Sequence, residues 1–167
     1  MAIILITGGA RSGKSVRAEL RALSFPGRPV YIATAEPLDA EMRERIAQHR
    51  ARRGSVWQEC ETPLELVAAL RDTDRGGARL VDCLTLWLSN LLQASRDWAQ
   101  EAEALADTLA HQNNPVVLVT NEVGLGIVPD NALARQFRDA SGVLNQMIAR
   151  VADEVEFMVA GLPMRVK

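Results

Sequence analysis

The chain has 167 residues, a formal net charge of -2 and 48% hydrophobic residues, which together predict one folded domain with a real core. The small net charge gives no reason to expect nucleic acid or an anionic membrane as a partner. Cys60 and Cys83 lack the paired spacing of a zinc site, and the first apolar run is too short for a signal peptide or a membrane span. We therefore expect a single cytoplasmic domain over residues 1–167.

The first half of the chain alternates apolar strands with helices. Strands are predicted at 2–7 and 29–34, and helices at 15–23 and 38–53, the second capped by Asp39 or by the turn before it. A brief extended piece is expected at 55–59. Thr62 to Glu65 forms a capping-box pattern, which predicts a helix from there to about Arg71.

The second half continues the alternation. Strands are predicted at 78–81, 116–120 and 155–160, and helices at 84–92, 97–111 and 131–154, with a break at Gly142 allowed in the last helix. Strands that alternate with helices indicate an α/β fold, in which a mostly parallel sheet is covered on both faces.

The most informative stretch runs from Gly8 to Ser15. Gly8, Gly13, Lys14 and Ser15 occupy every fixed position of the phosphate-loop pattern G-x-x-x-x-G-K-[ST]. Glycines let the loop curl so that its N–H groups point at one anion, and the helix that begins near Lys14 adds its positive end. Lys14 would reach the outer phosphates, and the Ser15 hydroxyl would bind Mg²⁺. The alternative is a glycine turn that merely joins a strand to a helix, but the required context is present, so the sequence predicts nucleoside triphosphate binding.

Polar residues follow two later strands. Asp82 ends the strand at 78–81, where a P-loop fold places the carboxylate that holds Mg²⁺ directly or through water, although a helix-capping aspartate is the alternative. Asn121 and Glu122 follow the strand at 116–120, and the carboxyl ends of parallel strands face the crevice where ligands bind. An ordinary turn explains Asn121 and Glu122 equally well.

The helix at 38–53 carries a basic face. Arg45, His49, Arg52 and Arg53 fall at i, i+4, i+7 and i+8, so they share one side of the helix. Such a face would attract a polyphosphate, and a neutral imidazole among arginines could attack phosphorus. On spacing alone, a solvated basic face is the better interpretation. The other histidine, His111, lies at a helix end and is assigned no catalytic role.

Four separated stretches resemble the family of bifunctional adenosylcobinamide kinases/adenosylcobinamide-phosphate guanylyltransferases of cobalamin biosynthesis. The resemblance runs from Ile4 to the C-terminal lysine, and its last block is its most specific part. The blocks are the loop at 8–15; 31–35 with 39–42, Arg45-Ile46 and His49-Arg50; Asp82-Cys83-Leu84-Thr85 with Asn90-Leu91-Leu92; and 120–129 with Leu133-Ala134-Arg135, Phe137-Arg138-Asp139, Gly142, Asn145-Gln146 and Ala152-Asp153.

The resemblance implies a RecA-like P-loop fold and gives His49 a role that its spacing does not. The histidine at this position in the family receives GMP from GTP, so His49 and Lys14 are the implied catalytic residues, and Ser15 and Asp82 the implied metal ligands. By position, the implied nucleotide site comprises Gly8, Gly9, Ala10, Arg11, Ser12, Gly13, Lys14, Ser15, Ala33, Thr34, Ala35, Arg50, Ala51, Arg52, Arg53, Glu61 and Asp82.

The implied chemistry has two parts. A triphosphate, ATP or GTP, first phosphorylates adenosylcobinamide, and GMP then passes from GTP through His49 to adenosylcobinamide phosphate. Mg²⁺ is the expected cofactor, the corrinoid is the expected substrate, and the resemblance implies a homotrimer. Two alternatives stay open: a P-loop kinase of another small alcohol, and a regulatory protein that hydrolyses GTP, although no Asn-Lys-x-Asp guanine-reading motif is evident.

Overall fold

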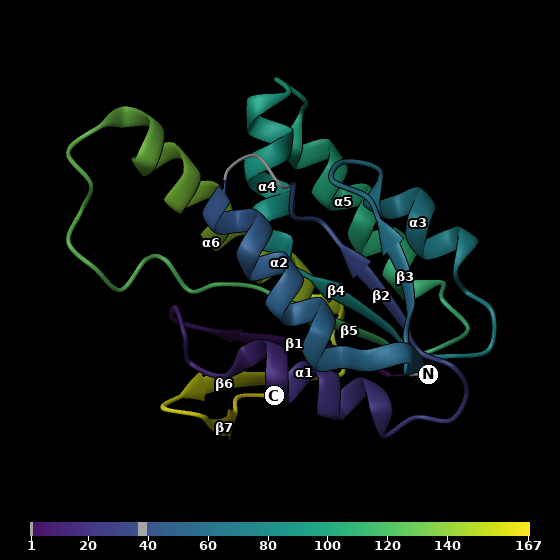
Figure 1. The fold of residues 1–167 in the computed structure, drawn as a ribbon. Coiled ribbons are helices and arrows are strands. Elements are labelled where there is room, and N and C mark those ends of the chain that lie inside the picture. The colour runs from purple at the N-terminus through teal and green to yellow at the C-terminus, as the bar shows by residue number, and fades with distance from the viewer. Residues whose placement is uncertain (1, 37–39) are drawn as a thin grey trace.

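The computed structural model describes residues 2–36 and 40–167; within the helix at 40–53, the side chains of residues 41, 42, 45, 49 and 52 lie outside the described part. Seven strands form one sheet in the order β3-β2-β4-β5-β1-β6-β7 (Figure 1). The strands are β1 (Ile3–Gly8), β2 (Val30–Ala33), β3 (Gln58–Glu61), β4 (Arg79–Asp82), β5 (Val116–Val119), β6 (Glu154–Val159) and β7 (Leu162–Arg165). The helices are α1 (Lys14–Leu23), α2 (Ala40–Arg53), α3 (Leu66–Asp72), α4 (Leu84–Gln93), α5 (Trp98–Ala110) and α6 (Ala132–Val151), with a 3₁₀ turn at Gly54–Val56.

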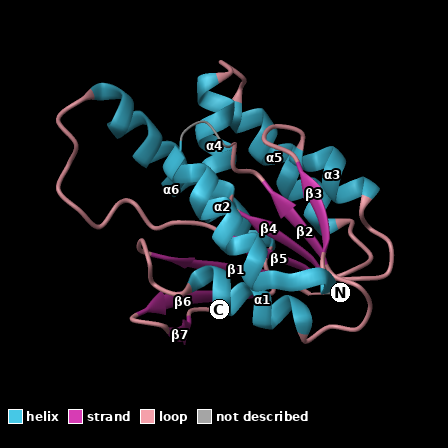
Figure 2. Ribbon diagram, viewed as in Figure 1, coloured by secondary structure: helices cyan, strands magenta, loops and turns pink. Residues whose placement is uncertain are grey.

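The sheet is parallel except for its last pair, β6 and β7, which run antiparallel. Its central strands are buried on both faces because helices cover each side (Figure 2). Ile4 and Ile6 of β1 pack toward α1, and Ile3 and Leu5 pack on the opposite face with the buried sides of α3, α4, α5 and α6. The prediction of a mostly parallel α/β sheet covered on both faces is therefore confirmed.

Two local predictions between the second and fourth strands differ from the structure. A third, the cap Asp39, lies outside the described residues and stays a prediction; α2 is described from Ala40. The extended piece predicted at 55–59 is confirmed only in its last part, because a 3₁₀ turn occupies 54–56 and β3 begins at Gln58. The capping-box prediction at 62–65 is wrong, because the Thr62 N–H donates to the Ala33 carbonyl at 2.8 Å and so continues the strand ladder; α3 begins only at Leu66.

The C-terminal region also differs from the prediction. Helix α6 passes through Gly142 without a break, because its buried side packs Leu144 and Ile148 into the core, which offsets the helix cost of about 1 kcal/mol for one glycine. It ends at Val151, and residue 154 already belongs to β6. The sequence analysis missed β7, which returns from β6 through Ala160 and Gly161 at φ angles of 50° and 84°, the positive values that a tight hairpin turn requires.

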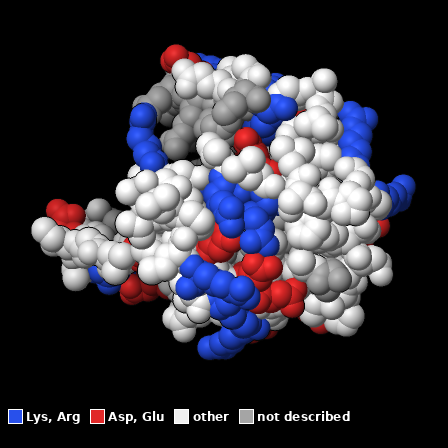
Figure 3. All heavy atoms as spheres, turned by 90° about the horizontal axis from the view of Figure 1, so that it is seen from below, with Lys and Arg blue, Asp and Glu red and all other residues white. Residues whose placement is uncertain are grey.

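Ion pairs attach α1 to β6. The Arg17 guanidinium donates to both oxygens of Glu156, at 2.7 Å each, and Arg21 bridges Glu154 and Glu156. Acidic and basic side chains lie next to each other across the middle of the face seen in Figure 3. Among the described residues, no helix combines the length and the apolar character needed to cross a bilayer.

Candidate functional site

The loop between β1 and α1 has the backbone that its glycines predict. Gly13 caps α1 at a φ of 94°, in the left-handed region, and Gly8 has a φ of 150°. A Cβ on Gly8 would lie 2.7 Å from the Met158 carbonyl oxygen and 2.9 Å from Ser12 Oγ, so only glycine fits there. No side chain caps α1, and its first N–H groups are therefore available to an anion inside the loop.

Lys14 lies across this loop. Its side chain is almost fully buried, and Nζ donates to the Gly9 carbonyl at 2.5 Å and contacts Ser12 Oγ at 3.5 Å. The ammonium is therefore held against the loop, where it would meet an anion bound by the loop N–H groups. This is the position in which a phosphate-loop lysine contacts the outer phosphates.

Asp82 lies at the end of β4, and its carboxylate is oriented by Tyr31. The Tyr31 hydroxyl donates to Asp82 Oδ2 at 2.9 Å, whereas Oδ1 accepts no hydrogen bond from the described residues. Burial, together with the Asp82 charge, raises the pKa of Tyr31 above its usual 10, so the hydroxyl keeps its proton. The helix-capping alternative is wrong, because Cys83 is the N-cap residue of α4.

Ser15 and Asp82 fit the requirements of one magnesium ion. Mg²⁺ prefers hard oxygen ligands and completes its shell with water and phosphate oxygens. Asp82 offers its open oxygen Oδ1, and the Ser15 hydroxyl, in the first turn of α1, makes no hydrogen bond to the described residues. The described residues contain no cluster of three histidine, cysteine or acidic side chains.

Thr34 connects the ends of β2 and β4 from a fully buried position. Its hydroxyl donates to the Cys83 carbonyl at 2.7 Å and accepts from the Cys83 N–H at 2.8 Å, and Asn90 donates to the Thr34 carbonyl at 2.8 Å. The Thr34 side chain therefore faces inward, and a nucleotide would meet the neighbouring backbone and the half-buried Ala33 and Ala35. Cys83 is a buried free thiol, and burial raises its pKa to about 11.

The basic helix α2 is tied to β3 through carboxylates. Arg50 donates to Glu59 at 2.7 Å and to Glu61 at 2.6 Å, and Arg53 donates to Glu59 at 2.8 Å. Burial alone would raise the pKa of Glu59, but the hydrogen bonds from Arg50 and Arg53 outweigh it and lower that pKa. Arg53 is only 4% exposed, with its guanidinium carbon 3.5 Å from the Tyr31 ring centre, so it is not the solvated residue that spacing favoured.

Several predicted site residues of α2 cannot be placed as side chains. His49 and Arg52 belong to α2 by their backbone, but their side chains, like that of Arg45, lie outside the described residues. Ala51 is exposed. The structure therefore places the helix that carries His49 and leaves the role of its imidazole as a prediction.

The first residues of the loop after β5, Thr120 and Asn121, belong to a polar network that the sequence analysis missed. The Thr120 hydroxyl donates to Asn145 Oδ1 at 2.7 Å, and the Asn121 N–H donates to Thr85 Oγ1 at 2.7 Å. Glu122 donates its N–H to the Gly8 carbonyl at 3.0 Å, next to the phosphate loop. Its carboxylate accepts from the N–H groups of Gly124 and Leu125. Glu122 therefore borders the phosphate loop and also forms a turn, which was the alternative explanation for this residue.

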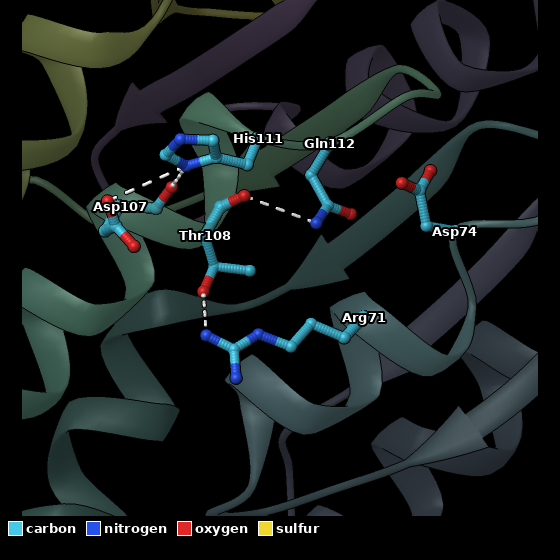
Figure 4. Close-up of a pocket in the computed structure, with 6 residues that line it drawn as sticks. All are labelled: Arg71, Asp74, Asp107, Thr108, His111 and Gln112. Atoms are coloured by element: carbon cyan, nitrogen blue, oxygen red, sulfur yellow. Dashed lines mark hydrogen bonds and ion pairs between the residues drawn. The ribbon is translucent and has the colours of Figure 1, made fainter.

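A separate polar pocket of about 420 Å³ lies beside α3 and the end of α5, where the chain leads into the starts of β4 and β5 (Figure 4). Arg71 donates to Thr108 Oγ1 at 3.1 Å, and His111 Nδ1 lies 2.8 Å from the Asp107 carbonyl oxygen. No predicted site residue lines this pocket, which is formed by Arg71, Asp74, Asp107, Thr108, His111 and Gln112. His111 is thus separate from the phosphate loop, which lies at the carboxyl ends of the strands.

Replacing Tyr31 by phenylalanine is expected to weaken the candidate magnesium site while keeping the aromatic ring on which Arg53 packs. Loss of the hydroxyl frees the Asp82 carboxylate to rotate, and loss of such a supporting contact typically costs about tenfold or more in metal affinity. The Mg²⁺ concentration that gives half-maximal triphosphate binding should rise accordingly, as measured by Trp fluorescence titration. The rise should be uniform from about pH 6 to 9, because the raised pKa keeps Tyr31 protonated there. Unchanged Mg²⁺ dependence, with normal folding, would contradict the role assigned to Tyr31.

Comparison with known proteins finds relatives along the whole chain. The family described as cobinamide kinase / cobinamide phosphate guanyltransferase matches residues 4–166. The bifunctional adenosylcobalamin biosynthesis protein CobP of Pseudomonas aeruginosa is 49% identical over 166 residues, which cover 98% of this chain and 96% of that protein. The bifunctional adenosylcobalamin biosynthesis protein CobU of Salmonella typhimurium is 42% identical over 182 residues, with 99% of each chain covered.

Solved structures resemble this chain in fold. The flagellar accessory protein FlaH of Methanocaldococcus jannaschii aligns with a TM-score of 0.56 at 12% identity, covering 99% of this chain and 78% of that one. An ATPase from the type III secretion system of pathogenic bacteria aligns with a TM-score of 0.56 at 13% identity, covering 98% and 56%. Together with the phosphate loop, these similarities confirm a RecA-like P-loop fold.

Proposed function

Because the chain belongs to the cobinamide kinase / cobinamide phosphate guanyltransferase family, we propose that it catalyses both of these transfers in the synthesis of coenzyme B12. The main support is the complete phosphate loop, with Lys14 lying across it, in a chain that matches the family from residue 4 to residue 166. The site residues named below are part of the proposal.

The first transfer moves the γ-phosphoryl group of ATP or GTP to the aminopropanol hydroxyl of adenosylcobinamide. The hydroxyl oxygen attacks the γ-phosphorus, the bond to the β-phosphate oxygen breaks, and the hydroxyl proton leaves to solvent. Lys14 and the loop N–H groups, together with the N-terminal end of α1, stabilise the negative charge that develops on the phosphate oxygens. Mg²⁺, held by Ser15 and Asp82, would neutralise part of that charge.

The second transfer passes through His49. A ring nitrogen of His49 attacks the α-phosphorus of GTP, pyrophosphate leaves, and a phosphoramidate with GMP forms. A phosphate oxygen of adenosylcobinamide phosphate then attacks the same phosphorus, so that the imidazole leaves and adenosylcobinamide-GDP forms. The division into two steps avoids bringing two highly anionic substrates together at once.

The nucleotide contacts implied by the resemblance complete the proposal. The loop residues 8–15, Ala33, Ala35 and Asp82 lie at or beside the carboxyl ends of the strands, where ligands bind in such sheets. Arg50 pairs with Glu59 and Glu61, and Arg53 pairs with Glu59, so a nucleotide that uses Arg50, Arg53 or Glu61 has to replace some of these contacts. Assembly as a homotrimer and a cytoplasmic location, where triphosphates are available, belong to the same proposal.

Product analysis tests the function. Wild-type protein supplied with Mg²⁺, adenosylcobinamide and excess GTP should release one GDP and one pyrophosphate for each corrinoid converted. Release of GDP without any change in the corrinoid would favour the GTP-hydrolysing regulatory protein. Formation of phosphorylated corrinoid without release of pyrophosphate would indicate a kinase that lacks guanylyl transfer activity.

A further inference from the structure

The strand order places the end of β5 between two parts of the candidate nucleotide site. β5 lies between β1, which leads into the phosphate loop, and β4, which ends at Asp82 (Figure 1). In the strand register, Val119 of β5 is paired with Ile6 on one side and with Asp82 on the other. The residues that directly follow Val119 therefore lie between the phosphate loop and the candidate magnesium ligand.

The chain stays extended for three residues beyond β5. The Thr120 N–H donates to the Ile6 carbonyl at 3.0 Å. Two residues later, the Glu122 N–H donates to the Gly8 carbonyl, also at 3.0 Å, so the hydrogen-bond ladder with β1 continues. Side chains along an extended chain point alternately to the two faces of a sheet. The Asn121 side chain therefore points to the face opposite to that of Thr120.

Asn121 and Asp82 point to the face of the sheet that α1 covers. Val119, two residues before Asn121, packs in the buried cluster that includes Ala18 of α1. Leu80, two residues before Asp82, packs in the same cluster. The phosphate loop leads directly into α1, so the carboxamide of Asn121 and the carboxylate of Asp82 both lie on the side of the sheet where this loop turns into its helix.

Asn121 is held through its backbone, whereas its carboxamide is left open. Its N–H donates to Thr85 Oγ1 at 2.7 Å, and its carbonyl accepts from Asn145 Nδ2 at 3.3 Å. The partly buried carboxamide makes no hydrogen bond to any residue that the structure describes. The turn that follows is formed by the Glu122 carboxylate, so a turn does not account for the Asn121 side chain.

A carboxamide at this position suits the γ-phosphate of a bound triphosphate. The loop N–H groups and Lys14 would meet the phosphates from the side of β1 and α1, and Mg²⁺ would lie toward Asp82. Asn121 Nδ2 offers two N–H donors without a charge, so it can bind a phosphate oxygen without displacing the metal. Because negative charge spreads over the γ-phosphate oxygens during transfer, a donor fixed beside them stabilises the transition state.

We propose that Asn121 is a further catalytic residue, whose carboxamide donates an N–H to a γ-phosphate oxygen from between the phosphate loop and Asp82. Its part in phosphoryl transfer rests on the proposed function, whereas the contact itself requires only a bound triphosphate. The contact involves the γ-phosphate alone. It therefore distinguishes a triphosphate from a diphosphate, and the first transfer from the second, which takes place at the α-phosphorus.

Isothermal titration with GTP and with GDP, each with Mg²⁺, tests the contact without a corrinoid. In Asn121→Asp an anionic oxygen replaces the donor, so GTP affinity should fall about tenfold or more, while GDP affinity stays within about twofold of the wild type. Gln100→Glu is the matched control. It exchanges a carboxamide for a carboxylate at an exposed position of α5, which packs on the opposite face of the sheet, and should leave both affinities unchanged.

Steady-state kinetics measure what the contact does for catalysis. In Asn121→Ala, kcat for phosphorylation of adenosylcobinamide should fall about tenfold to a hundredfold, with the KM for adenosylcobinamide within about twofold. Guanylylation of the protein at saturating GTP should also stay within about twofold, because its reaction centre is the α-phosphorus. Thermal unfolding should be unchanged, since no described residue loses a hydrogen bond to this carboxamide.

The results that would overturn the proposal are distinct from those that would overturn the proposed function. Equal losses of GTP and GDP affinity in Asn121→Asp, or no loss of either, would exclude the contact with the γ-phosphate. Equal losses of both transfers in Asn121→Ala would make the residue structural. A wild type that leaves the corrinoid unchanged would count against the proposed function alone, and a selective loss of GTP affinity in Asn121→Asp would still support the contact.

Discussion

Replacing Lys14 by alanine is expected to lower both transfers by about a hundredfold to a thousandfold, because both depend on a triphosphate held in the same loop. The Lys14 ammonium lies against the Gly9 carbonyl at 2.5 Å, with almost no exposure to solvent. Its removal leaves the loop N–H groups to bind the triphosphate without the help of the ammonium, so triphosphate binding weakens directly. Isothermal titration with GTP and Mg²⁺, beside assays of both transfers, measures the effect.

Two controls make the Lys14 result interpretable. Lys14→Arg keeps the charge but not the compact ammonium, so it should recover only part of the binding. Thermal unfolding should show a loss of only a few degrees, since one hydrogen bond contributes about 1 kcal/mol and a domain of this size loses about 2–4 °C per kcal/mol. Normal GTP affinity in Lys14→Ala would contradict the assigned role of the loop.

The phosphate loop could be predicted from the sequence because its chemistry is local. Gly8, Gly13, Lys14 and Ser15 lie within one turn, and each is required by the backbone curl or by the charge of the ligand. The buried central strands β1, β2, β4 and β5 were predictable for a similar reason, since burial on both faces produces continuous apolar runs such as the one in β1.

Contacts between distant segments could not be predicted. The Tyr31–Asp82 and Thr120–Asn145 hydrogen bonds join residues 51 and 25 positions apart, and no periodicity within one element reports them. The same holds for Arg79, which interrupts an apolar run in the sequence. The structure buries it completely and pairs it with Asp74 at 2.9 Å, at the start of β4 and away from Asp82 at its end. Local helix propensity did not predict the conformation at Thr62 or Gly142 either. Strand pairing decided it at Thr62, and packing of α6 decided it at Gly142.

The role of His49 could not be predicted from residue spacing, because the spacing of the basic helix favoured a solvated face. Only the resemblance to the family gave this histidine a role. Arg50 and Arg53 hold this helix to Glu59, and Arg53 packs on the Tyr31 ring that orients Asp82. The helix that carries His49 is thereby connected to the candidate magnesium ligand through side-chain contacts.

Replacing His49 by alanine is expected to abolish guanylyl transfer, by about a thousandfold or more, and to retain kinase activity, because only the second transfer uses its nitrogen as a nucleophile. The measurement uses GTP labelled at the α-phosphate and Mg²⁺, followed by denaturation of the protein. The wild type should keep a label that is acid-labile and alkali-stable, as a phosphoramidate is, and His49→Ala should keep none.

The chain has two histidines, so His111→Ala is the matched control. His111 is exposed at the end of α5, beside the pocket of Figure 4, and its variant should be labelled like the wild type. Equal loss of both transfers in His49→Ala would make this histidine structural, and an unlabelled wild type that still binds GTP would leave a kinase or a GTPase as the better account.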